Sequence, residues 1–367
     1  MRRNTATVIS LLVLWCVTGI TQAQVTDTTE VIGFDEVVEE PLPQAGSDWT
    51  DRIHLSGRFD LNLEVLNPME DDDLRSSRFQ NYHRYLFLKV TPDDRITFDA
   101  EVLDMSYYEL AYDLGDGYSV ALGKIWVPFG ATPFHHYYGG VQGDPFTGLL
   151  LPNVWAEYGA TLRSDFYSSD RVSASGDVFL VSGFDGPTGE VLRFASGGTE
   201  NRFAVGGRTA VRIGNQLALW GSAMYNRFGE DNEGEILLWG GDILADYGLV
   251  DAPLLRDLRL RAAFARAEIR DEDLVSPVDS KDYWYYRYGD YVELTYRGFQ
   301  KVQPRLRYGT IIDFDDRITG RDSHNWDLAA MSRIGRHVML LAQYQINLEE
   351  INERDNDLFR FQLAFEF

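Results

Sequence analysis

The chain has 367 residues, with 34 basic and 57 acidic side chains and a formal net charge of −23. This charge argues against duplex nucleic acid as a partner, because proteins that bind it neutralise phosphates with excess Lys and Arg. Mean hydropathy is −0.26, and beyond the N-terminus no apolar stretch is long enough to cross a bilayer as a helix. Composition therefore excludes a helical membrane protein and leaves a β-barrel open, since every second residue of a barrel strand faces water.

The N-terminus predicts export. Arg2 and Arg3 precede the apolar run 8–20, and small and polar residues follow it up to Ala23. These are the parts of a secretory signal peptide, which we expect to span residues 1–23 and to be removed after Ala23. Cys16 would leave with it, so disulfides would not stabilise the mature chain. Residues 24–50 are acidic with little periodicity, and we interpret them as a periplasmic lead-in before the folded part at 51–367.

From Arg52 onwards apolar and polar residues alternate. Ile53, Leu55, Gly57 and Phe59 are separated by polar residues, and the alternation continues for thirteen residues. Comparable segments recur along the chain, joined alternately by short turns and longer loops. This pattern predicts an all-β fold, a 16-stranded antiparallel transmembrane β-barrel with a long constriction loop. The expected strands are 52–66, 79–91, 95–104, 107–114, 117–127, 154–165, 170–182, 201–213, 216–227, 235–247, 257–269, 288–298, 301–313, 324–334, 337–349 and 357–367.

The C-terminal segment has the pattern of a closing barrel strand. Phe359, Phe361, Leu363, Phe365 and Phe367 share one face, and Arg360, Gln362 and Glu366 share the other. Such a strand suits lipid outside and water inside. An amphipathic edge strand of a soluble β-sandwich is the alternative for this segment alone.

Arginine recurs on the polar face of the expected strands. After loss of the signal peptide the chain keeps 28 arginines and four lysines. Arginine's fixed fork of donors suits oxyanions, so a row of inward arginines would suit anion passage. The alternative is that they pair with inward acids and stiffen the wall. The candidate pore-lining arginines are Arg58, Arg163, Arg208, Arg212, Arg259, Arg261, Arg297, Arg305, Arg307 and Arg333.

The segment 128–153 is the longest expected loop, and it is aromatic and rich in glycine. Long loops with little charge are often functional, and folding into the pore would bury the aromatic surface. We therefore expect this loop to form the constriction. Its candidate residues are Pro128, Phe129, Gly130, His135, His136 and Asp144.

The stretch Gly123-Lys124 followed by Pro128-Phe129-Gly130 resembles a motif of the phosphate-selective porin family, which has Gly-Lys-x-x-x-Pro-Phe-Gly before its constricting third loop. The resemblance covers residues 52–367 in layout, but only this motif and the terminal Phe367 are specific. It implies a trimeric barrel in the outer membrane and diffusion of small anions such as phosphate. It also implies that Lys124 lines the pore. The scarcity of lysine and the surplus of acid depart from the family pattern.

The sequence leaves two other classes of function open. An outer-membrane barrel hydrolase would need a nucleophile and a base, but there is no Gly-x-Ser-x-Gly elbow and only six histidines. A secreted soluble carbohydrate-binding β-protein would dissolve without detergent. His135 and His136 lack the spaced Cys or carboxylate partners of a metal site, so we expect neither metal nor cofactor. The expected partners are outer-membrane lipid, lipopolysaccharide and small ionic solutes.

Overall fold

The computed structural model describes residues 52–66, 77–131, 150–152, 155–188, 191–194, 203–228, 234–246, 255–271, 283–299, 301–314, 322–349 and 357–367. The expected signal peptide and lead-in lie outside these residues. Within them, no helix is long and apolar enough to cross a membrane.

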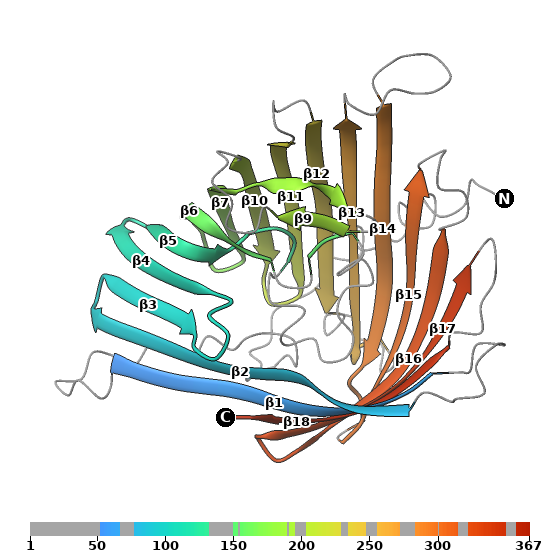
Figure 1. The fold of residues 1–367 in the computed structure, drawn as a ribbon. Coiled ribbons are helices and arrows are strands. Elements are labelled where there is room, and N and C mark those ends of the chain that lie inside the picture. Colours follow the sequence, from blue (N-terminus) through green and yellow to red (C-terminus); the bar gives the residue numbers. More distant parts are fainter. Residues whose placement is uncertain are drawn as a thin grey trace.

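Sixteen antiparallel strands form one closed barrel, in which β1 and β18 are neighbours (Figure 1). The barrel strands are β1 Ile53–Leu66, β2 Ser77–Asp93, β3 Ile96–Glu101, β4 Tyr108–Gly115, β5 Tyr118–Trp126, β6 Ala156–Ser168, β7 Val172–Ser182, β10 Phe203–Ile213, β11 Leu217–Phe228, β12 Gly234–Asp246, β13 Leu258–Asp271, β14 Tyr283–Tyr296, β15 Gln303–Phe314, β16 Ser323–Ile334, β17 Val338–Glu349 and β18 Leu358–Glu366. The predicted fold class and the sixteen strands are confirmed. Boundaries differ most at β14, which begins five residues before the predicted 288.

A further hairpin, which the sequence did not predict, lies between β7 and β10. It consists of β8 Phe184–Thr188 and β9 Val191–Phe194, which pair only with each other. Since β7 and β10 are themselves paired, the hairpin is an insertion between two adjacent barrel strands.

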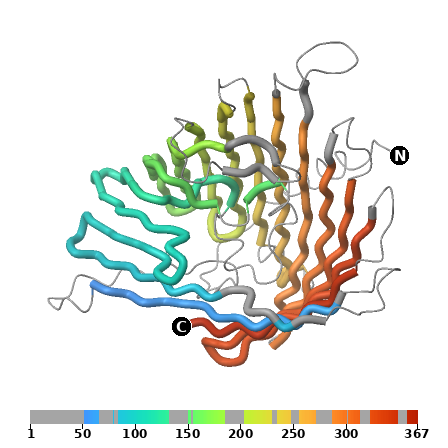
Figure 2. The backbone as a smooth tube through the Cα atoms, in the orientation of Figure 1, coloured from blue at the N-terminus to red at the C-terminus, as the bar shows by residue number. Residues whose placement is uncertain are grey.

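The barrel closes where its first and last strands pair (Figure 2). Gly57 and Phe367 exchange both backbone hydrogen bonds, with N···O distances of 2.9 and 3.1 Å. A Cβ on Gly57 would lie 2.7 Å from the Phe367 ring and 2.7 Å from the Tyr85 carbonyl oxygen. β1 therefore needs glycine at position 57, where it pairs with the C-terminal segment.

Most of the short connections lie at one rim of the barrel. Short turns join β2 to β3, β4 to β5, β6 to β7, β10 to β11 and β16 to β17. Gly214 and Gly335, with φ of 55° and 68°, supply the left-handed conformation that two of these reversals need. Because neighbouring strands are antiparallel, the connection after β5 lies at the opposite rim.

Candidate functional site

The barrel is apolar outside and polar inside, which reverses the burial pattern of a soluble protein. On β1 and β18, Phe59 and Phe361 are exposed, whereas Arg58 and Glu64 are buried. Directly opposed residues of an antiparallel pair share a face, so the register extends this assignment from strand to strand. Large apolar side chains exposed on the outer face recur on β4, β5, β7, β10, β14 and β18. An outer surface of this kind suits hydrocarbon.

Most of the predicted inward arginines are held in ion pairs with inward acids. Arg163 donates two hydrogen bonds to Glu109, at 2.9 and 2.7 Å. Arg307 and Glu293 form a pair at 2.7 Å in which each side chain is only 3% exposed. Similar pairs join Arg58 with Asp60 and Glu366, Arg208 with Asp177, Arg297 with Asp246, Arg333 with Glu366 and Arg360 with Glu64. Wall pairing therefore accounts for much of the arginine pattern.

Four further arginines contact an aromatic ring, lie deep in the wall or face an acid across the strand ladder. The guanidinium of Arg212 lies 5.9 Å from the ring centre of Trp220, and that of Arg261 lies 6.0 Å from that of Tyr291. Arg305 is buried on β15, and Arg259 faces Asp246 across the β12–β13 ladder. The pore-lining role of these arginines stays a prediction.

Inward charges of opposite sign lie on opposite sides of the barrel. Among the described inner side chains of β3 to β6 there are six acids and one arginine, Arg163; the acids are Asp99, Glu101, Glu109, Asp113, Glu157 and Asp165. Among the described inner side chains of β13 to β15 there are five arginines and one acid, Glu293; the arginines are Arg259, Arg261, Arg287, Arg305 and Arg307. β4 and β14, which belong to these two groups, are eight strands apart in the ring of sixteen. The interior is thus polarised across its width.

Lys124 does not lie on the inner wall, which corrects the assignment taken from the family resemblance. It pairs with Tyr108 on one side and Tyr158 on the other, and it shares a face with the exposed Leu122. Because side chains alternate along a strand, this is the outward face. The alternation of side chains along β5 would have placed Lys124 correctly from the sequence, because Leu122, two residues before it, faces outward.

The segment after β5 turns into the barrel. The Gly130 N–H donates to Ser222 Oγ at 2.9 Å, and Arg208 donates to the Gly130 carbonyl oxygen at 3.2 Å. Phe129 lies close enough to Gly240 that a Cβ there would meet its ring at 3.3 Å. Arg208, Ser222 and Gly240 belong to β10, β11 and β12, which are separated from β5 by β6 and β7. The first residues of the predicted constriction loop therefore lie against the inner wall.

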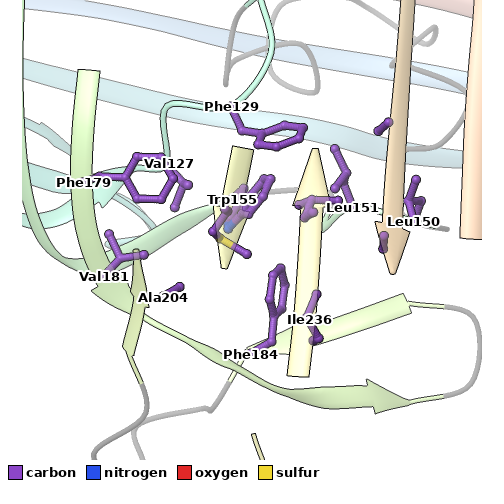
Figure 3. Close-up of a cluster of buried hydrophobic side chains, with 14 of the residues drawn as sticks. Val127, Phe129, Leu150, Leu151, Trp155, Phe179, Val181, Phe184, Ala204 and Ile236 are labelled. Carbon is purple, nitrogen blue, oxygen red and sulfur yellow. The ribbon is translucent and has the colours of Figure 1, made fainter. Parts of the chain in front are cut away.

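Both ends of this loop join an apolar cluster on that wall (Figure 3). Phe129 and Trp155 lie 5.3 Å apart between ring centres, and Leu150 and Leu151 are buried beside them. The cluster also contains Met224 and Phe228 of β11, Ile236 and Leu238 of β12 and three alanines of β13. His135, His136 and Asp144 lie outside the described residues. Among the described side chains, no group of His, Cys, Asp or Glu could hold a metal ion.

Several solved structures share this architecture. An anion-selective porin from Comamonas acidovorans superimposes with a TM-score of 0.61 at 12% identity, over 86% of this chain and 99% of that one. The fold is that of a porin. A loop-deletion mutant of OmpT, an outer membrane protein of Vibrio cholerae, gives 0.58 at 13% identity, over 86% and 99% of the two chains. Salmonella typhi OmpF, in complex with daunomycin, gives 0.59 at 10% identity, over 86% and 97%.

Sequence comparisons give no finer assignment. No model of a protein family matches the chain, and no curated protein matches it either. At identities of 10 to 13% the structural matches establish the porin fold alone. The finer resemblance to phosphate-selective porins stays a prediction.

Proposed function

We propose that the protein is an outer-membrane porin through which small hydrophilic solutes diffuse passively. The observation that carries this proposal is the reversed burial pattern on a closed sixteen-stranded sheet, with exposed apolar side chains outside and ionic side chains within. A soluble carbohydrate-binding protein has no use for so large an apolar exterior. The inward course of the chain after β5 supplies a constriction of the kind a diffusion pore needs.

The charges of the wall support weak selectivity rather than strong preference for one ion. Paired arginines and acids cancel at a distance, so a passing ion responds mainly to the excess of acids on β3 to β6 and the excess of arginines on β13 to β15. Acids on β3 to β6 and arginines on β13 to β15 orient a field across the pore, and such a field acts on dipolar and zwitterionic solutes. The motif at 123–130 suggests a narrower version of this proposal, in which the solutes that pass are anions such as phosphate.

Location and assembly follow from the same proposal. Residues 1–23 would direct export, and 24–50 would form a periplasmic lead-in. The outward aromatic and apolar side chains would contact outer-membrane lipid and lipopolysaccharide. One of the similar solved structures, OmpT of Vibrio cholerae, is described as a trimer form. We propose a homotrimer for this chain as well.

Planar-bilayer recording tests the function directly. Purified protein should insert in discrete conductance steps, and a salt gradient should give a reversal potential close to zero. A large potential of the anionic sign would support the arginine-ladder interpretation, and a large potential of the cationic sign would contradict it. Protein that remains soluble without detergent and adds no conductance would refute the porin assignment itself.

A further inference from the structure

Asn226, a buried side chain of the inner wall, hydrogen-bonds the first residue of the β8–β9 hairpin. Its Oδ1 accepts the Phe184 N–H at 3.0 Å, and its Nδ2 donates to the carbonyl oxygens of Phe184 and Arg227, each at 3.0 Å. The amide thus pairs with both backbone polar groups of Phe184, as a neighbouring strand would. Asn226 is fully buried.

The register places this attachment inside the barrel. Asn226 stands opposite Ala204 and Ile236, which are both fully buried. The adjacent residues Tyr225 and Leu237 are exposed on the outer face. The chain after β7 therefore turns inward at Gly183. A short loop could have joined β7 to β10 without entering the barrel, because these two strands pair directly with each other.

The hairpin and the constriction loop meet on the same apolar cluster. The ring centre of Phe184 lies 5.8 Å from that of Trp155, which in turn contacts Phe129. Phe184 is fully buried, and Figure 3 shows it beside Trp155 and Ile236. Two segments from different rim connections thus share one docking surface, so that displacement of one exposes apolar surface of the other to water.

We propose that Asn226 is a positioning residue that holds the β8–β9 hairpin in the lumen, where the hairpin narrows the pore together with the inward-turned residues 128–130 and sets its size limit. This rests on the proposed porin function. A hydrogen-bonded amide suits the task because it fixes the hairpin's backbone, whereas the apolar contacts alone would allow it to slide.

Asn226→Leu tests the proposal, because leucine fills a similar volume but can neither donate nor accept. We expect single-channel conductance to rise about 1.5-fold or more, since conductance follows the narrowest cross-section, and larger sugars to enter proteoliposomes. The matched control is Asn62→Leu, which removes a fully buried inner amide on β1, eight strands away from β11. It should leave conductance unchanged.

Thiol labelling reports the hairpin's position without relying on conductance. In a Cys16→Ser background, Phe184→Cys should react slowly with a membrane-impermeant reagent and at least tenfold faster when Asn226→Leu is added, because burial limits access. Should Asn226→Leu fail to fold, Gly183→Ala disturbs the same contact from the other side. Its Cβ would lie 1.8 Å from Asn226 Oδ1.

Three results would decide the matter. Faster labelling with higher conductance supports the proposal. Faster labelling with unchanged conductance and size limit means that the hairpin does not constrict the pore, and unchanged labelling means that Asn226 does not hold it; either result overturns the proposal. If the wild-type protein forms no channel at all, the porin function fails instead, and labelling still reports whether Asn226 positions the hairpin.

Discussion

The contribution of the ion pair between Glu293 and Arg307 to the free energy of unfolding depends on how well the barrel wall excludes water. Arg307 donates to one oxygen of Glu293 from Nε and Nη2, at 3.0 and 2.7 Å, and stands between Glu293 and Asp327 in the strand register. Both paired side chains are 3% exposed, and Asp327 is buried as well. Arg307→Gln would therefore leave two buried carboxylates without their shared cation. Removal of one partner of a buried pair costs about 3–5 kcal/mol, and we expect a loss in this range.

Urea unfolding in lipid vesicles, followed by tryptophan fluorescence, provides the free energy of unfolding. Glu293→Gln combined with Arg307→Gln should recover most of the loss, because Asp327 keeps the hydrogen bond from Gln343 at 2.8 Å. Arg84→Gln is the control, since its pair with Asp104 is 3.7 Å long with side chains 64% and 54% exposed, and the midpoint should not move. A loss below about 1 kcal/mol for Arg307→Gln would show that water screens the pair and would refute the buried-wall reasoning.

Three further outcomes follow from the same geometry. Gly57→Val should prevent stable pairing of β1 with β18, because the Tyr85 carbonyl oxygen cannot move away, and the folded form that resists denaturation by detergent without boiling should disappear from gels. Phe361→Arg places a charge on the lipid-facing side of β18 and should cost about 2–4 kcal/mol if the site lies near the bilayer midplane; equal stability in detergent and bilayer would contradict that placement. Lys124→Gln should leave the reversal potential unchanged, because Lys124 lies between Tyr108 and Tyr158 on the outer face, and a shift would mean that the side chain reaches the pore.

The strand pattern was predictable because a barrel strand has two different solvents on its two faces. Residues 359–367, apart from Ala364, and residues 53–65 alternate between apolar and polar side chains, and each segment forms a strand whose large apolar side chains face outward. Gly214-Asn215 and Gly335-Arg336 mark reversals because both glycines take positive φ. These signals are local, so the sequence contains them in full.

Partners across the sheet were not predictable in the same way. Arg163 and Glu109 are 54 residues apart, and Arg58 and Glu366 are 308 apart. Parity indicates that such side chains share a face, but only the register places them at hydrogen-bonding distance. The inner docking of Gly130 on Ser222 depends likewise on a contact between segments that no local pattern records.

The docking of the inward-folded segments can, however, be recognised in part from the sequence of the strands against which they pack. A strand with water on its inner face keeps polar residues there, whereas β7 reads Val178-Phe179-Leu180-Val181 and β12 reads Ile236-Leu237-Leu238-Trp239, apolar on both parities. In the structure Phe179, Val181, Ile236 and Leu238 face inward and are buried in the cluster that also holds Trp155 and Phe184. Loss of alternation in an otherwise alternating barrel therefore marks the wall that inward-folded segments cover. It follows that the inward-folded segments cover the part of the inner wall that these residues of β7 and β11 to β13 form.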